Sequence, residues 1–136
     1  METLSNYSTE IEVPVRAKEA FKALNEGLDA WWGQISHADF SLNGAFTITF
    51  DNAYWWTFKI IEYVPDKRLI WECIAGEPVF NKEWIGHTLH WNIEEQPSKT
   101  LVKFLQKGLT PRLHCFDVCT ATWDMFITQK LVAYLK

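Results

Sequence analysis

The chain has 136 residues, 48% apolar and 22% charged, with a formal net charge of -4, values typical of one globular domain covering residues 1–136. The excess of acidic side chains argues against nucleic acid as a partner, because neutralising phosphates requires a basic surface. These ordinary apolar and charged fractions also argue against a disordered chain. A membrane span is disfavoured because no uncharged stretch approaches the roughly 20 apolar residues that a bilayer requires.

The start of the chain and the cysteines indicate the compartment. Residues 1–12 contain no basic region followed by an apolar run, so they do not resemble a secretory signal. Three cysteines are an odd, small number that fits a reducing compartment without a disulfide framework. We therefore expect a cytoplasmic protein without a cofactor, either a monomer or a homodimer.

The aromatic content is unusual for a chain of this length. The sequence contains eight Trp, nine Phe and four Tyr residues, and each large ring is able to bury roughly 150–250 Å². Either the core is exceptionally aromatic or some of the rings line a cavity. Composition does not decide between these two alternatives.

The N-terminal part predicts one strand and two short helices. Loose alternation favours a strand over Tyr7–Val15, ending near Pro14. Apolar residues then recur at spacings of three and four from Ala17 to Leu28, which is the pattern of an amphipathic helix. Gly27 interrupts it, so we expect a second short helix that reaches Trp31 and Trp32.

Six further strands, separated by turn residues, are predicted before the last element, giving an antiparallel sheet of about seven strands. Asn43-Gly44 predicts a two-residue hairpin, because its turn type needs positive φ at both positions. The predicted strands are Asp39–Leu42, Ala45–Phe50, Tyr54–Val64, Arg68–Ile74, Trp84–Glu94 and Thr100–Lys107.

A long helix is predicted at the C-terminal end. Thr110 and Pro111 suit the cap and the first helical position. About 25 residues at 1.5 Å each give roughly 37 Å, the width of a domain of this length. The apolar stripe comprises Leu113, Phe116, Thr120, Trp123, Ile127, Leu131 and Tyr134. We therefore predict an α+β fold in which a curved antiparallel sheet wraps around this helix.

Rings from the sheet are predicted to converge on this helix. Side chains alternate along a strand, so Trp56 and Phe58 share one face while Lys59 marks the solvated face. Imperfect packing between such rings is where apolar ligands bind. The predicted ligand-binding residues are Phe46, Trp56, Phe58, Trp84, Phe104, Phe116, Cys119 and Trp123, with Thr88, His90 and Gln106 as polar contacts.

Catalysis and metal binding have weaker support. His87 and His90 lie on opposite faces of one predicted strand, and we expect His90 to face inward. Cys115 and Cys119 are neighbours on the helix, but zinc needs about four converging ligands, so we interpret both as buried thiols. No nucleophile elbow, phosphate-binding loop or metalloprotease motif occurs in the sequence. We predict no catalytic residue and no metal.

Several motifs resemble START-like (SRPBCC) proteins, in the branch similar to the C-terminal domain of the activator of the 90-kDa heat-shock protein ATPase. They are Trp31-Trp32-Gly33, Gly44-Ala45-Phe46, Val64-Pro65-Asp66-Lys67-Arg68-Leu69, Glu83-Trp84-Ile85-Gly86 and Trp123-Asp124. The resemblance implies a helix-grip fold with a cavity for apolar ligands. Many relatives carry a histidine where this chain has Gln106, so no role of that histidine is transferred.

Three functions follow as hypotheses. The first is non-catalytic binding of a small hydrophobic or aromatic molecule between sheet and helix. The second, implied by the resemblance, is a module that regulates a chaperone through its surface. The third is a cyclase-like enzyme, which would need an inward polar pair such as His90 with Glu62 or Glu83. A void of roughly 300 Å³ beside Trp123 would favour the first, and a filled interior the second.

Overall fold

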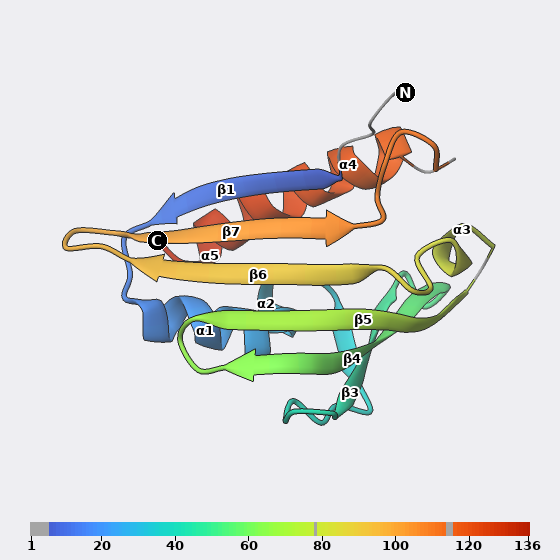
Figure 1. Ribbon diagram of the computed structural model, residues 1–136, viewed down its shortest axis with the longest axis horizontal. Helices are drawn as coiled ribbons and strands as arrows, with labels where there is room; N and C mark the ends of the chain where they lie inside the picture. Colours follow the sequence, from blue (N-terminus) through green and yellow to red (C-terminus); the bar gives the residue numbers. More distant parts are fainter. Residues whose placement is uncertain (1–5, 78, 114–115) are drawn as a thin grey trace.

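The computed structural model describes residues 6–77, 79–113 and 116–136, and its framework is one antiparallel sheet. Seven strands lie in the order β1-β7-β6-β5-β4-β3-β2 (Figure 1). They are β1 (Tyr7–Val13), β2 (Gln34–Ser36), β3 (Ala45–Phe50), β4 (Tyr54–Val64), β5 (Arg68–Glu77), β6 (Thr88–Glu95) and β7 (Thr100–Lys107). β1 pairs with β7 although the other five strands lie between them in the sequence.

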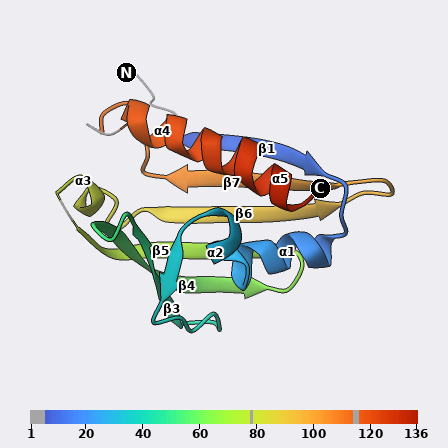
Figure 2. The same cartoon turned by 180° about the vertical axis from the view of Figure 1, so that it is seen from behind.

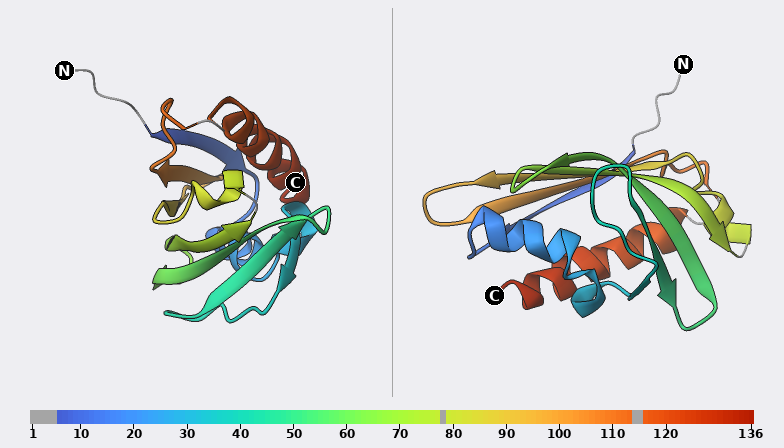
Figure 3. Two further views of the ribbon diagram at one scale, coloured as in Figure 1. Left: turned by 90° about the vertical axis from the view of Figure 1, so that its right-hand side faces the viewer. Right: turned by 90° about the horizontal axis from the view of Figure 1, so that it is seen from below.

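The helices that follow β1 and β7 all lie on one face of the sheet (Figures 2 and 3). They are α1 (Ala17–Asn25), α2 (Leu28–Trp31) and a C-terminal helix made of α4 (Phe116–Asp124), the π-helical segment η1 (Met125–Leu131) and α5 (Val132–Tyr134). A short helix, α3 (Val79–Lys82), follows β5. The predicted helix-grip architecture is therefore confirmed, including the two short helices after the first strand.

α1 illustrates why the sequence folds in this way. Ala17, Ala20, Phe21 and Leu24 are buried against the sheet, and the lysines between them are exposed, as the helical spacing predicts. The helix ends at Asn25, and α2 starts after Gly27. Among the described helices, none combines the length and the apolar character needed to cross a bilayer.

Two predictions between α2 and β3 are wrong. Gln34–Ser36, and not Asp39–Leu42, pairs with β3. Asn43 does have a positive φ of 70°, but the Gly44 amide donates to the Ser41 carbonyl at 2.9 Å. The chain thus makes a four-residue turn inside a longer connection. The side chain of Asp39 stabilises this connection by accepting from the Ser41 hydroxyl at 2.6 Å.

The C-terminal helix also departs from its predicted limits. Thr110 accepts the Leu113 amide at 3.0 Å in a separate turn, and the described helix begins at Phe116. Its π-helical segment changes the phase of the apolar stripe. As a result Leu135 is buried, whereas Tyr134, which the regular α-helical spacing placed on the stripe, is 49% exposed.

Candidate functional site

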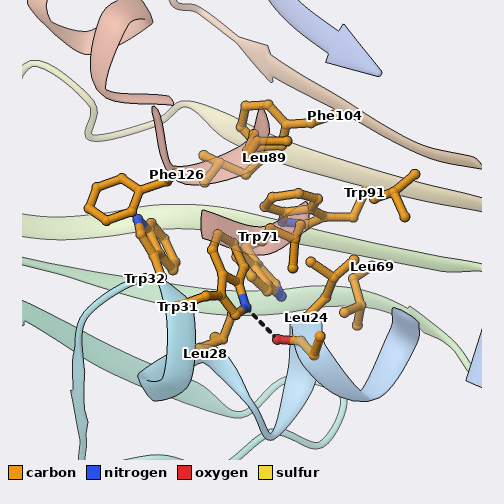
Figure 4. Packing of buried hydrophobic residues seen from close by; sticks show 14 of the residues in the cluster. Leu24, Leu28, Trp31, Trp32, Leu69, Trp71, Leu89, Trp91, Phe104 and Phe126 are labelled. Carbon is orange, nitrogen blue, oxygen red and sulfur yellow. Dashed lines mark hydrogen bonds between the residues drawn. The ribbon is translucent and has the colours of Figure 1, made fainter. Parts of the chain in front are cut away.

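The space between sheet and helix is occupied by aromatic rings that surround Trp123. The Trp123 ring centroid lies 4.5 Å from Phe104, 5.2 Å from Trp32 and 5.9 Å from Trp84. All four side chains are at most 5% exposed. Figure 4 shows Trp32, Trp71, Trp91 and Phe104 converging from the sheet and from α2. We call Trp32, Trp71, Trp84, Trp91, Phe104 and Trp123 the interior ring cluster.

Several of these rings are stacked nearly parallel. Trp84 lies 14° from the plane of Trp123, and Trp32 lies 12° from that of Trp71. At the edge of the cluster, the half-buried Trp56 stacks on Trp84 with centroids 4.3 Å apart. Offset stacking of this kind adds to the burial of apolar area. The rings thus fill the region in which the sequence predicted a ligand.

Two phenylalanines predicted in this region pack next to the interior ring cluster. Phe46 and Phe58 are fully buried on adjacent strands, and their centroids lie 5.7 Å apart. Phe46 also meets Trp71 edge to face at 5.0 Å. Their inward orientation agrees with the alternation of the strands. Their part in ligand binding stays a prediction.

A series of hydrogen bonds between buried polar side chains crosses the interior ring cluster. The Trp123 indole N–H donates to the Gln106 side-chain oxygen at 2.8 Å, and the Gln106 amide lies 3.1 Å from Nδ1 of His87. Because the amide nitrogen donates, His87 Nδ1 accepts and the imidazole is neutral. Burial lowers the pKa of His87, against the opposing influence of Glu83, which favours this neutral form at pH 7.

The inward histidine is therefore His87, and the expected orientation of His90 and Thr88 is wrong. These two side chains hydrogen-bond to each other at 2.8 Å on the outer face of β6, while Leu89 and Trp91 are fully buried. The prediction failed because residues 84–87 form a turn with Gly86 at φ +94°. The turn resets the alternation at Thr88. An inward catalytic pair built on His90 is excluded by this geometry.

Other predicted residues lie at the margin. Phe116 and Cys119 on α4 are half-buried. Cys119 is disulfide-bonded, which contradicts its interpretation as a buried thiol and the expectation of a chain without disulfides. Cys73 is a free thiol whose pKa burial raises to about 12. Cys115 lies outside the described residues. No group of three or more metal-ligating side chains occurs in residues 6–77, 79–113 and 116–136.

Some buried donors lack partners. Within the described residues, the indole N–H groups of Trp71, Trp84 and Trp91 have no hydrogen-bond partner, although such groups are usually paired when buried. Trp31 and Trp56 show the usual behaviour, since their indoles donate to backbone carbonyls at 2.9 and 3.1 Å. Figure 4 shows the bond of Trp31 to Ala23 as a dashed line.

Two hollows of the described structure lie away from Trp123, which lines neither of them. One, which we call the α1 groove, has a volume of about 680 Å³ between the start of α1, the β4–β5 turn and the end of β6. It is lined by Ala17, Lys18, Val64, Asp66, Lys67, Arg68, Asn92, Ile93 and Glu95. The other, of about 440 Å³, lies over β1 and β7 and shares Asn92 with the first.

Sequence reasoning missed several of these residues. Alternation along the two central strands would have found Trp91, which lies between His90 and Asn92, and Trp71, which Glu72 follows. His87 was missed because of the turn before β6. The α1 groove has no local signal at all, since three segments far apart in the sequence form it.

Comparison with known proteins places the chain in a described group. The family model "Activator of Hsp90 ATPase homolog 1-like protein" matches residues 14–136. No curated protein matches the sequence.

Solved structures with the same fold cover almost the whole chain. The Aha1 dimer from Colwellia psychrerythraea is 21% identical, with a TM-score of 0.80 over 96% of this chain and 95% of the other. CalU16 from Micromonospora echinospora is 13% identical, with a TM-score of 0.72 over 98% and 82%. DynU16, a putative protein in the dynemicin biosynthetic locus, is 18% identical, with a TM-score of 0.74 over 94% and 46%. At these low sequence identities, the structural similarity shows only that the fold is the same.

Proposed function

The chain belongs to the family of activator of Hsp90 ATPase homolog 1-like proteins, and we propose that it is a non-catalytic cytoplasmic regulator that docks on a 90-kDa heat-shock chaperone through its outer surface. The observation that carries this proposal is the filled interior. Aromatic side chains of the sheet and of the segment after α2 pack directly against Trp123 of the C-terminal helix. The hollows described above open to the outside.

Two further features support a surface function over catalysis. Gln106, the polar side chain in the middle of the ring cluster, is fully buried and already holds Trp123 and His87. A cyclase-like reaction would need His90 with Glu62 or Glu83, and both His90 and Glu62 lie on the outer face of the sheet, in the row of side chains that includes Ile70. The interior therefore offers no free acid–base pair of the predicted kind.

The chaperone proposal is tested by the ATPase rate of a purified 90-kDa heat-shock chaperone with and without this protein. We expect the turnover number to change with increasing protein and to reach a plateau at saturation. Turnover in the presence of a chaperone ATPase inhibitor is the blank. An unchanged turnover number with increasing protein would contradict the proposal.

A second candidate function is the binding of a small aromatic molecule inside the ring cluster. The unpartnered indole N–H groups of Trp71, Trp84 and Trp91 favour it, because a ligand with acceptor oxygens would satisfy them. Entry would require Trp84 to leave its stack on Trp56, whose indole N–H donates to the Asn81 carbonyl after β5. Such a ligand would be planar and would carry acceptor atoms.

The test uses 1-anilinonaphthalene-8-sulfonate, which has aromatic rings and acceptor oxygens. If the interior binds it, Trp91→Phe, which removes one donor and little volume, weakens the affinity about tenfold, the equivalent of one lost hydrogen bond. The control is His90→Gln on the outer face, which leaves the affinity unchanged. Equal affinity for the wild type and Trp91→Phe, or no saturable fluorescence change, removes this candidate.

A further inference from the structure

The α1 groove has the size and the walls of a binding site. Its volume of about 680 Å³ falls within the range of ligand pockets, roughly 300–1,000 Å³. A backbone hydrogen bond of 2.8 Å from the Ile93 amide to the Lys67 carbonyl fixes the β4–β5 turn against β6. Elements far apart in the sequence therefore hold the groove in place.

Three cationic side chains outnumber two carboxylates, those of Asp66 and Glu95, in the lining of the groove. Lys18 lies in the first turn of α1, Lys67 in the β4–β5 turn and Arg68 at the start of β5. Arg68 is paired with Glu62 at 3.0 Å. Neither Lys18 nor Lys67 forms an ion pair within the described residues. Two lysines are thus available to an anionic partner at this groove.

A carboxylate of the chain itself also lines the groove. The Glu95 side chain accepts the Ala17 amide at 2.9 Å and lies 3.6 Å from the Arg16 guanidinium. The amide at the start of a helix and a guanidinium are the partners that carboxylates prefer. The Glu95 carboxylate is therefore already satisfied by the chain itself, and Lys18 and Lys67 stay without a partner of this kind in the part of the chain that the structure describes.

Apolar side chains form part of the wall, next to the amide of Asn92. Val64 is 38% exposed, whereas Ala17 and Ile93, which line the same groove, are buried. A wall of this kind suits a ligand whose charges alternate with apolar groups. The net charge of -4 disfavours a long polyanion, because the rest of the surface would repel it.

We propose that the α1 groove is the docking site for a short acidic segment of the partner protein, with its carboxylates on Lys18 and Lys67 and an apolar side chain on Val64. This inference rests on the proposed function, since it assigns to a site the contact with the chaperone. Electrostatic contact at such a site raises the association rate and decreases with salt.

The experiment measures binding of the labelled protein to the 90-kDa chaperone by fluorescence anisotropy. The variant Lys18→Glu/Lys67→Glu is expected to bind about tenfold more weakly, because it replaces attraction by repulsion. The control Lys107→Glu/Lys130→Glu makes the same change in net charge at exposed positions outside the groove and is expected to bind as the wild type does. Glutamate at position 18 suits the first turn of α1, so the variant keeps its fold.

A labelled peptide of alternating Glu and Leu provides a second arm that does not need the chaperone, and its Gln-for-Glu counterpart is the control. We expect the wild type to bind the Glu peptide in a salt-dependent manner and the Lys18→Glu/Lys67→Glu variant to lose it. If the chaperone binds the wild type and this variant equally, the groove assignment is overturned while the proposed function stands. If the wild type binds no chaperone, the proposed function falls. If, in addition, the wild type does not bind the Glu peptide, the assignment of the α1 groove as a docking site for acidic segments is overturned as well.

Discussion

Replacing Trp123 with alanine is expected to lower the free energy of unfolding by about 3–5 kcal/mol, the usual cost of removing a large buried ring. Trp123 contacts Trp32, Trp84 and Phe104 and is only 2% exposed. Its loss leaves a cavity and removes the donor to Gln106, so that a buried amide oxygen loses its partner. Urea denaturation followed by far-ultraviolet circular dichroism measures the effect.

The control for this variant lies on the same helix. Val118 is 71% exposed, and Val118→Ala is expected to change the stability by less than about 0.5 kcal/mol. A loss below about 1 kcal/mol for Trp123→Ala would show that the interior collapses easily around the missing ring. That result would contradict the tight packing on which the surface function is based.

Gly108→Ala is expected to have the second largest effect, a loss of about 2–3 kcal/mol from backbone strain and a steric clash together. Gly108 has a φ of +114°, which L side chains rarely adopt. An alanine Cβ there would lie 2.4 Å from Cδ2 of His87. The His87 ring would have to move away from Gln106, the residue that holds Trp123 in place.

Gly86 provides a matched control for this prediction. Its φ is +94°, but a Cβ at Gly86 would meet no atom within 4 Å. Gly86→Ala therefore carries the backbone strain without the clash, and it should destabilise the protein less. In the double variant His87→Ala/Gly108→Ala the clash is absent, so the two losses should not add. Equal losses of stability for Gly86→Ala and Gly108→Ala would contradict the predicted clash, because they would show that the His87 ring moves aside at no measurable cost in free energy.

The fold was predictable because its main signals are local. Alternation over β3, β4 and β7 and the helical spacing from Ala17 to Leu24 correspond to buried faces in the structure. The π-helical segment was not predictable from the apolar stripe, because an α-helical period was assumed throughout. The error became visible at the end of the stripe, where Leu135 replaced Tyr134.

The candidate site was predicted less completely, for two physical reasons. A glycine turn at residues 84–87 reset the phase of β6, so His90 and Thr88 were placed on the wrong face. The volume left between rings depends on side-chain packing, which alternation along strands does not describe. Residues such as Phe46 and Phe58 were correctly placed inside, but the pattern could not tell a filled interior from a hollow one.

The most direct test of a surface function compares three proteins in the chaperone ATPase assay. The wild type and the interior variant Trp91→Phe should change the turnover of the 90-kDa chaperone equally, because Trp91 is fully buried. The groove variant Lys18→Glu/Lys67→Glu should lose the effect at the same concentration. If Trp91→Phe abolishes the response while the groove variant keeps it, the ring cluster and not the outer surface carries the function.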